Sequence, residues 1–163
     1  MDALDKIVTL EDLANRLGKV RKSGRKIVFT NGCFDIMHVG HVRYLAEARS
    51  QADMLIVGLN SDGSMRTIKG EKRPIVHQDH RAEVLASLAC VDYVVLFEEP
   101  DPLRLIQTIK PDVLVKGEDW AADAIIGADD VKSRGGKIVR ISFIEETSTT
   151  GIIQTILQRY QGD

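Results

Sequence analysis

Two histidines three positions apart, His38 and His41, lie in the short segment TNGCFDIMHVGH, residues 30–41. Imidazole serves as a metal ligand, as a general base and as a hydrogen-bond donor to phosphate, so the spacing alone does not choose among these chemistries. A zinc site would need further ligands, and the other two histidines, His77 and His80, lie in a separate polar segment without nearby cysteines. The pattern therefore disfavours zinc.

The residues that directly follow a strand-like apolar run are Asn31, Gly32, Cys33 and Phe34. Gly32 would let the backbone approach a ligand closely, and the following amides together with a helix N-terminus would face an anion. If a helix begins near His38, both imidazoles lie on one of its faces, and Gly40 between them leaves room for a flat group. A phosphate site is thus indicated, although a histidine at a helix start more often caps the helix or lies at the surface. Neither GxGxxG nor GxxxxGK[ST] occurs, which argues against a dinucleotide oxidoreductase and a P-loop kinase.

A basic segment, MRTIKGEKRP at 65–74, follows the second strand-like run, and its cations are Arg66, Lys69, Lys72 and Arg73. We expect a flexible loop on the carboxyl side of the sheet that closes over a polyphosphate. The alternative is a solvated surface loop, which is what charge runs usually are.

Two more segments offer phosphate donors. In ETSTTGII, residues 146–153, Ser148, Thr149 and Thr150 precede an apolar helical pattern, and a helix cap explains only one of these three hydroxyls. In VKGEDW, residues 115–120, Lys116 and Gly117 end another strand-like run. Together with the histidine segment, these residues are expected at one rim of the sheet.

The elements that must position these residues alternate between strand and helix. Five short runs rich in β-branched residues predict buried strands at 26–30, 53–60, 92–97, 112–117 and 137–142. Helical patterns lie between them at 42–51, 80–89, 101–110 and roughly 121–135, with further helices at about 10–21, capped by Thr9, and about 149–161. This alternation predicts an α/β fold with a doubly wound, parallel, five-stranded sheet and helices on both faces, whose ligands bind at the carboxyl ends of the strands.

Length and composition are those of one ordinary domain. The chain has 163 residues, of which 44% are hydrophobic and 28% charged, with a net charge of −2 and a pI near 6.1. This balance gives no global attraction to nucleic acid, and the longest apolar run, at 54–59, is far too short to span a bilayer. We expect a cytoplasmic protein with small-molecule substrates, no nucleic-acid or membrane partner, and two reduced cysteines.

The segment HVGH matches the HxGH signature, so the chain resembles the nucleotidyltransferase superfamily of cytidylyltransferases, phosphopantetheine adenylyltransferase and class I aminoacyl-tRNA synthetases. More narrowly, TNGCFDIMHVGH, VGLNSDGSMRTIKGEKRP, PDVLVKGEDW and STTGII together are similar to the adenylyltransferases that make ADP-heptose from D-glycero-β-D-manno-heptose 1-phosphate. This resemblance runs from about Lys26 to Gln158. It implies a Rossmann-like fold, ATP and Mg²⁺, pyrophosphate as the second product, and a role in supplying the lipopolysaccharide inner core.

The same resemblance implies the domain organisation. Residues 1–24 would form an N-terminal helical extension and residues 25–163 the nucleotidyltransferase domain. Some relatives carry this domain behind a sugar kinase, and because no kinase segment is present here, a stand-alone form is expected. A homo-oligomer is left open.

The resemblance also implies roles for individual residues. His38 and His41 would donate to the triphosphate, with Lys69 assisting and Arg73 as a further candidate, while the loop at 31–34, Gly40, Lys116 and Gly117 would border the nucleotide. The hydroxyls at 148–150 would hold phosphate. Because a sugar 1-phosphate is already anionic, its attack on the α-phosphorus of ATP needs no general base.

Further substrate-binding candidates are Asp35, Asp62, Arg73, Arg81, Glu118 and Asp119. Asp35 would orient Mg²⁺ or the sugar, or cap the turn. Arg81 would reach a phosphate, or pair with Glu83 or Asp79 at the surface. The rival readings are a glycerol-3-phosphate cytidylyltransferase, which shares HxGH and the closing STT segment, and a nucleotide-binding domain without turnover.

Overall fold

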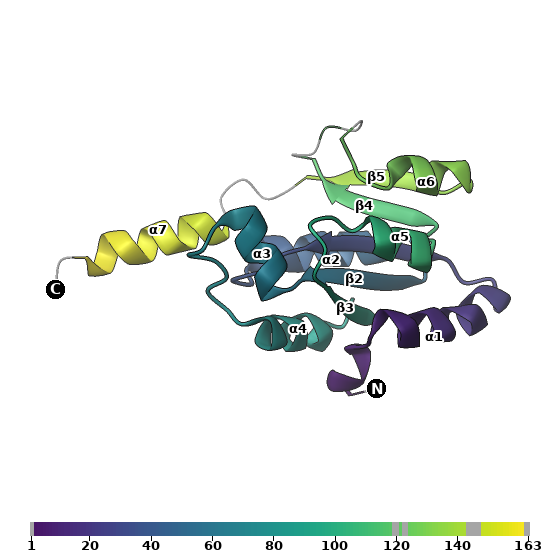
Figure 1. The fold of residues 1–163 in the computed structure, drawn as a ribbon, viewed down its shortest axis with the longest axis horizontal. Helices are drawn as coiled ribbons and strands as arrows, with labels where there is room; N and C mark the ends of the chain where they lie inside the picture. Colours follow the sequence, from purple (N-terminus) through teal and green to yellow (C-terminus); the bar gives the residue numbers. More distant parts are fainter. Residues whose placement is uncertain (1, 119–120, 122–123, 143–147, 162–163) are drawn as a thin grey trace.

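The computed structural model describes residues 2–118, 121, 124–142 and 148–161. Its centre is a parallel sheet of five strands in the order β3-β2-β1-β4-β5 (Figure 1). The strands are β1 (Ile27–Gly32), β2 (Met54–Asn60), β3 (Tyr93–Phe97), β4 (Val113–Gly117) and β5 (Lys137–Ile141). All five predicted strands and the Rossmann-like α/β class are therefore confirmed.

Seven α-helices and one 3-10 helix occur in the described residues. They are η1 (Leu4–Lys6), α1 (Leu10–Lys22), α2 (Val39–Ser50), α3 (Asp62–Lys69), α4 (Gln78–Ser87), α5 (Leu103–Ile109), α6 (Ala128–Ser133) and α7 (Thr149–Tyr160). The predicted cap of the first helix is confirmed, since Thr9 accepts a hydrogen bond from the Asp12 amide over 3.1 Å. None of the helices within the described ranges is long and apolar enough to cross a membrane.

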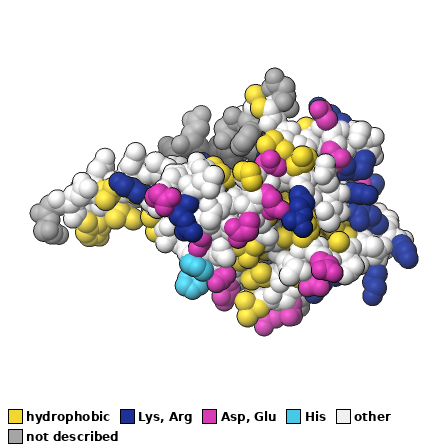
Figure 2. All heavy atoms as spheres, viewed as in Figure 1, with side chains coloured by type: hydrophobic (Ala, Val, Ile, Leu, Met, Phe, Trp, Pro, Cys, Tyr) yellow, Lys and Arg dark blue, Asp and Glu magenta, His cyan; other side chains and the backbone are white. Residues whose placement is uncertain are grey.

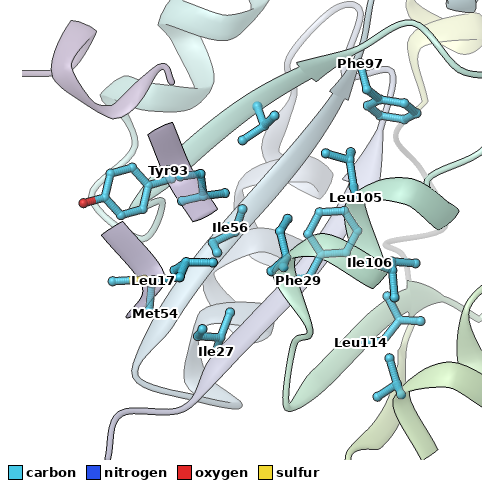
Figure 3. Close-up of a cluster of buried hydrophobic side chains, with 14 of the residues drawn as sticks. Leu17, Ile27, Phe29, Met54, Ile56, Tyr93, Phe97, Leu105, Ile106 and Leu114 are labelled. Carbon is cyan, nitrogen blue, oxygen red and sulfur yellow. The ribbon is translucent and has the colours of Figure 1, made fainter. Parts of the chain in front are cut away.

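The strands bury both faces because successive side chains point to opposite sides of the sheet. Ile27 and Phe29 join a core with α1, α5 and α6, drawn in Figure 3, while Val28 faces a second core with α2 and α4. Leu13 and Leu17 of α1 are fully buried in the first core. The N-terminal helix is thus packed into the body of the molecule.

Two predictions, one of a loop and one of a helix, were wrong in part. The expected loop at 65–74 begins as helix α3, because Ser61 caps it by accepting from the Ser64 amide over 3.0 Å and basic side chains lie at its C-terminal end, where the helix dipole favours them. The expected helix at roughly 121–135 is reduced to α6, and residues 119, 120, 122 and 123 lie outside the described part of the chain. The backbone of Gly127 is left-handed, with a φ of +83°, so the α-helix starts only after this residue. A side chain there would also clash, since a Cβ would lie 2.6 Å from Ile106 Cδ1.

Helix α7 projects from the body at the end opposite α6 (Figure 1). Thr149, in its first turn, is its one buried residue, whereas Ile156, Leu157 and Tyr160 are exposed by 49%, 47% and 71%. Hydrophobic side chains, yellow in Figure 2, accordingly lie at the surface of this helix. The helix is therefore held mainly at its N-terminal end.

Aspartates secure the opposite, amino-terminal edge of the sheet. Asp53, Asp92 and Asp112 each directly precede a strand, and each carboxylate accepts from a backbone amide at the start of a neighbouring strand, over 2.7, 2.8 and 2.9 Å. Asp112 takes the Ile27 amide and also pairs with Lys26 Nζ at 2.8 Å. Burial would raise the pKa of Asp112, but the hydrogen bonds from Lys26 and Ile27 outweigh it and lower the pKa below its ordinary value. These carboxylates fix the alignment of the strands at the edge of the sheet where the strands begin.

Replacing Asp112 by Ala should lower the free energy of unfolding by about 1–3 kcal/mol, because the Ile27 amide loses its acceptor. The exposed ion pair with Lys26 should add little. A carboxylate with a depressed pKa stabilises the fold above its unfolded-state pKa, so the difference from wild type should be full at pH 7 and shrink as the pH falls below the ordinary value of 3.8. Urea unfolding at several pH values measures this difference, with Asp129→Ala, a substitution of an exposed residue in α6, as the control. A loss no larger than that of the control would contradict the assigned role.

Candidate active site

The carboxyl ends of the strands open into a cavity of about 420 Å³. It lies where the strand order reverses, with β1 between β2 and β4, which is the usual ligand position in this architecture. The predicted residues that line it are Asn31, Gly32, Cys33, Phe34, Asp35, His41, Lys69, Arg73, Lys116, Gly117, Thr149 and Thr150. Residues from five separate segments thus meet in one cavity.

The two histidines form a stacked pair at the start of α2. The His38 and His41 ring centroids lie 3.8 Å apart with the planes inclined by 28°, and the Phe34 ring meets His41 edge-on at 5.3 Å. His38 is the N-cap residue of α2 but makes no side-chain capping bond, so it is not explained as a cap. His41 lines the cavity, whereas His38 and the buried Gly40 do not border it directly.

Both imidazoles are held neutral. The Nδ1 atoms of His38 and His41 are buried and have no hydrogen-bond partner among the described residues. Burial lowers the pKa of His41 to about 4, with a smaller contribution from the charge of His38, and burial also lowers the pKa of His38. Near pH 7 each neutral ring has one N–H donor and one acceptor nitrogen, and the pair is poised for a polar ligand.

The loop after β1 is shaped by an unusual residue. Phe34 has a φ of +44°, in the left-handed region that a bulky side chain rarely adopts. Its ring lies so close to Gly32 that a Cβ at that position would be 3.0 Å from Phe34 Cε2. A larger residue at position 32 would therefore push the Phe34 ring out of its place.

Three cationic side chains line the cavity, from α3, from the segment after it and from β4. Lys69 lies exposed in the last turn of α3, and Arg73 lies in the segment that follows it. Lys116, buried at the end of β4, donates to Asn31 Oδ1 at the end of β1. These cations share the cavity lining with the carboxylates of Asp35 and Asp101.

Asp35 is occupied by the protein. Its carboxylate pairs with Arg73 Nε at 2.5 Å and accepts from the amides of Ile75 and Val76 at 2.9 Å each. Asp35 therefore fastens the segment after α3 to the loop after β1, and its oxygens are engaged in that contact. Asp35 is therefore neither a cap of its own turn nor an unpaired carboxylate in this structure.

The three predicted hydroxyls divide into two roles. Ser148 is the N-cap of α7, accepting from the Gly151 amide over 3.0 Å, and it does not line the cavity. Thr149 and Thr150 do line it, and Thr149 Oγ1 also donates to the Ile36 carbonyl over 3.3 Å. The capping alternative thus applies to one hydroxyl of the three.

Three further candidates, Asp62, Arg81 and Glu118, do not line the cavity. Arg81 neither reaches it nor pairs with Glu83 or Asp79 at the surface: its side chain is buried against Asp62, 2.8 Å away. The predicted surface pairing of Arg81 was therefore wrong, and its position outside the cavity lining does not support the predicted contact with a phosphate. Glu118 is exposed and accepts from Ser142, and Asp119 lies outside the described residues.

Several lining residues were missed from the sequence: Tyr44, Asn60, Ile68, Pro100, Asp101, Pro102 and Ile126. Asn60 ends β2, and the Pro-Asp-Pro segment follows β3, so the rule that ligands bind beyond the carboxyl ends of the strands could have found them. Tyr44 lies in α2 one turn beyond His41, and its hydroxyl shares a hydrogen bond with Thr30 at 2.8 Å.

Relatives of known sequence match almost the whole chain. The bifunctional protein HldE of Geobacter metallireducens is 52% identical over 159 residues, which is 98% of this chain and 32% of that protein. The bifunctional protein HldE of Campylobacter concisus is 54% identical over 153 residues, or 94% of this chain and 30% of that protein. The chain thus spans about a third of the length of these curated relatives.

Two solved structures share the fold. A lipopolysaccharide core biosynthesis protein from Thermoplasma volcanium has a TM-score of 0.63 at 31% identity, covering 75% of this chain and all of that one. Pantoate-beta-alanine ligase from Francisella tularensis has a TM-score of 0.62 over 96% of this chain and 79% of that one, and at 17% identity it supports the fold alone. The profile of the cytidylyltransferase-like family matches residues 29–156, from β1 into α7 and across every segment of the cavity. The chain belongs to the cytidylyltransferase-like family of nucleotidyltransferases.

Proposed function

We propose that this protein transfers AMP from ATP to D-glycero-β-D-manno-heptose 1-phosphate, releasing pyrophosphate and ADP-heptose for the lipopolysaccharide inner core. The observation that carries the proposal is the neutral, stacked histidine pair at a cavity that also gathers Lys69, Arg73 and Lys116. The kinship with the HldE proteins and with a lipopolysaccharide core biosynthesis protein supports the sugar substrate. Residues 25–163 would perform the reaction, with 1–24 as a supporting extension, in the cytoplasm where ATP is supplied.

The proposed chemistry needs alignment and charge stabilisation. The 1-phosphate attacks the α-phosphorus without losing a proton, so a general base has no role. Negative charge develops on the phosphate oxygens, and N–H groups fixed in advance in a cavity with little water stabilise it more strongly than water does. His41, which lines the cavity, would donate to these oxygens, and His38 would hold its ring in place by stacking.

The other lining groups would bind the triphosphate. Lys69 and Arg73 come from the segment after β2, and Thr149 and Thr150 come from the start of α7, so cations and hydroxyls enter from different elements. Ammonium and guanidinium groups neutralise phosphate charge, and the hydroxyls and amides of a helix N-terminus donate to it. The loop at 31–34 and Lys116 would border the nucleoside.

Mg²⁺ is proposed to arrive with ATP. Two carboxylates line the cavity, but Asp35 is engaged by Arg73 and Asp101 accepts from the Leu103 amide over 2.9 Å. Within the described residues, no three His, Cys, Asp or Glu side chains are grouped to hold a metal. The protein residues therefore do not fit a closed magnesium site, and oxygens of the triphosphate and water would be the main ligands.

The substrate assignment is tested by pyrophosphate release with a panel of nucleotides and phosphates. ATP with the heptose 1-phosphate should give the highest kcat/KM. CTP with glycerol 3-phosphate should be at least a hundredfold slower, as expected when buried polar groups of the site lack partners on the wrong substrate. Faster turnover of the second pair would replace the proposal by a cytidylyltransferase, and ATP binding without turnover of any acceptor would indicate a binding domain.

Replacing His41 by Ala should lower kcat by about a hundredfold or more, with a smaller change in the KM for ATP, because one prearranged donor to the developing charge is lost. His41→Asn keeps an N–H donor and should recover part of the rate, which it could not do if His41 were a general base. The exposed His80→Ala in α4 is the control and should behave as wild type. Equal inactivity of the Ala and Asn variants, with wild-type activity dependent on stoichiometric zinc, would argue for a metal site instead.

ATP binding should be accompanied by proton uptake. The pKa of His41 is about 4 in the unliganded protein, and phosphate oxygens beside the ring favour its charged form and raise that pKa. Between the two pKa values the complex holds more protons than the free protein, so affinity should strengthen as the pH falls through that window. Calorimetry near pH 6 in buffers of different ionisation enthalpy counts the protons, and His41→Asn should take up fewer. Equal uptake by the variant would assign the proton to another group.

A further inference from the structure

Arg81 of α4 is the bulkiest fully buried side chain in the described part of the chain, with 1% of the residue exposed. A buried charge is retained only when it is paired and hydrogen-bonded, and Arg81 is both. Its Nη2 donates to Asp62 Oδ1 over 2.8 Å, its Nε to the Val76 carbonyl over 2.9 Å, and its Nη1 to the carbonyls of Cys33 and Asn60 over 2.5 and 2.9 Å. Arg81 itself does not line the cavity.

The acceptors of Arg81 come from the segments that form the cavity rim. Cys33 and Asn60 both line the cavity, one in the loop after β1 and the other at the end of β2. Asp62 opens α3, the helix that ends in Lys69. A single planar guanidinium therefore spans three separate pieces of chain, which its rigid fork of donors allows.

Val76 is fixed from both sides. Its amide donates to Asp35 over 2.9 Å, and its carbonyl accepts from Arg81 over 2.9 Å. Asp35 also pairs with Arg73 at 2.5 Å, three residues earlier in the same segment. Asp35 thus holds Arg73 directly, whereas Arg81 fixes the same segment three residues further on, at Val76.

We infer that Arg81, with Asp62, is a positioning residue that holds the segment 73–76 against the loop after β1, and thereby places Arg73 beside the triphosphate. This inference rests on the proposed nucleotidyl transfer. An apolar side chain would fill the same volume without the desolvation of a charge, but it would leave the Cys33, Asn60 and Val76 carbonyls without this donor. Arg81 does not line the cavity, so it would act only by positioning the residues that do.

The test uses Arg81→Lys, which keeps a charge beside Asp62 but replaces the fork by one ammonium group. Its kcat should fall roughly ten- to a hundredfold, because Arg73 would no longer be aligned with the charge that develops on the triphosphate, and a misplacement of about 1 Å can cost that much. Amide hydrogen exchange gives a readout independent of activity. The Ile75 and Val76 amides should exchange faster than in wild type, while amides of β1 and β2 keep their protection.

The matched control is Arg49→Lys. Arg49 also pairs with an aspartate, Asp92 at 3.0 Å, and also donates to a backbone carbonyl, that of Ala52 over 2.6 Å, but it lies at the amino-terminal edge of the sheet. The Arg49→Lys variant should have a lower melting temperature than wild type and an unchanged kcat. If Arg81→Lys does not fold, Asp62→Asn, which keeps the size of the side chain and removes its charge, is judged by the same two readouts.

Lower kcat together with faster exchange at Ile75 and Val76, in Arg81→Lys and not in Arg49→Lys, supports the inference. Unchanged exchange at these amides, a kcat within twofold of wild type, or an equal loss of kcat in Arg49→Lys would overturn it. Absence of nucleotidyl transfer in the wild type would remove the proposed function, while the exchange rates would still decide whether Arg81 holds the segment 73–76.

Discussion

The pairing of β1 with both β2 and β4 is the constraint on which the rest of the structure depends. Val28 faces Leu55 on one side and Val113 on the other, so β1 is central in a fully parallel sheet. Parallel strands end at the same edge, and the chain leaving β1 must turn at the point where the order reverses. The cavity, the loop at 31–34 and the histidine pair follow from that turn.

The histidine pair places a cost on the fold. Its two Nδ1 atoms are buried without a partner in the described residues, and such a group destabilises a protein by about 1–3 kcal/mol when it would otherwise be hydrogen-bonded. Phe34, at a positive φ, adds strain in the loop beside them. Unsatisfied and strained groups cluster at sites that bind ligands, because a ligand can satisfy what the protein leaves open. The apolar cores on both faces of the sheet offset this cost.

The sequence was sufficient to predict the strands and most of the residues that line the cavity. β-branched runs that are bounded by polar residues and separated by helices indicate buried parallel strands. Because ligands bind beyond the carboxyl ends of such strands, Asn31, Lys116 and Thr149 are expected at one place. Helix α3 was missed because its basic residues and glycine resemble a loop, while the decisive signal was the single cap at Ser61. The burial of Arg81 could not be predicted, because it depends on carbonyls from distant segments that only the folded chain brings together. Local patterns carry no information on such contacts.

The weak attachment of α7 has a thermodynamic consequence for the cavity. A 12-residue helix with one buried residue is marginal in water by itself, so its helix–coil equilibrium is governed largely by the Ser148 cap and the docking of Thr149. Any ligand that contacts the Thr149 or Thr150 hydroxyls only in the helical state must shift this equilibrium toward helix, and a more stable helix must in turn bind that ligand more tightly. A substitution as remote as one at Tyr160 that changed the stability of this helix would then change affinity in the cavity without any contact with the ligand.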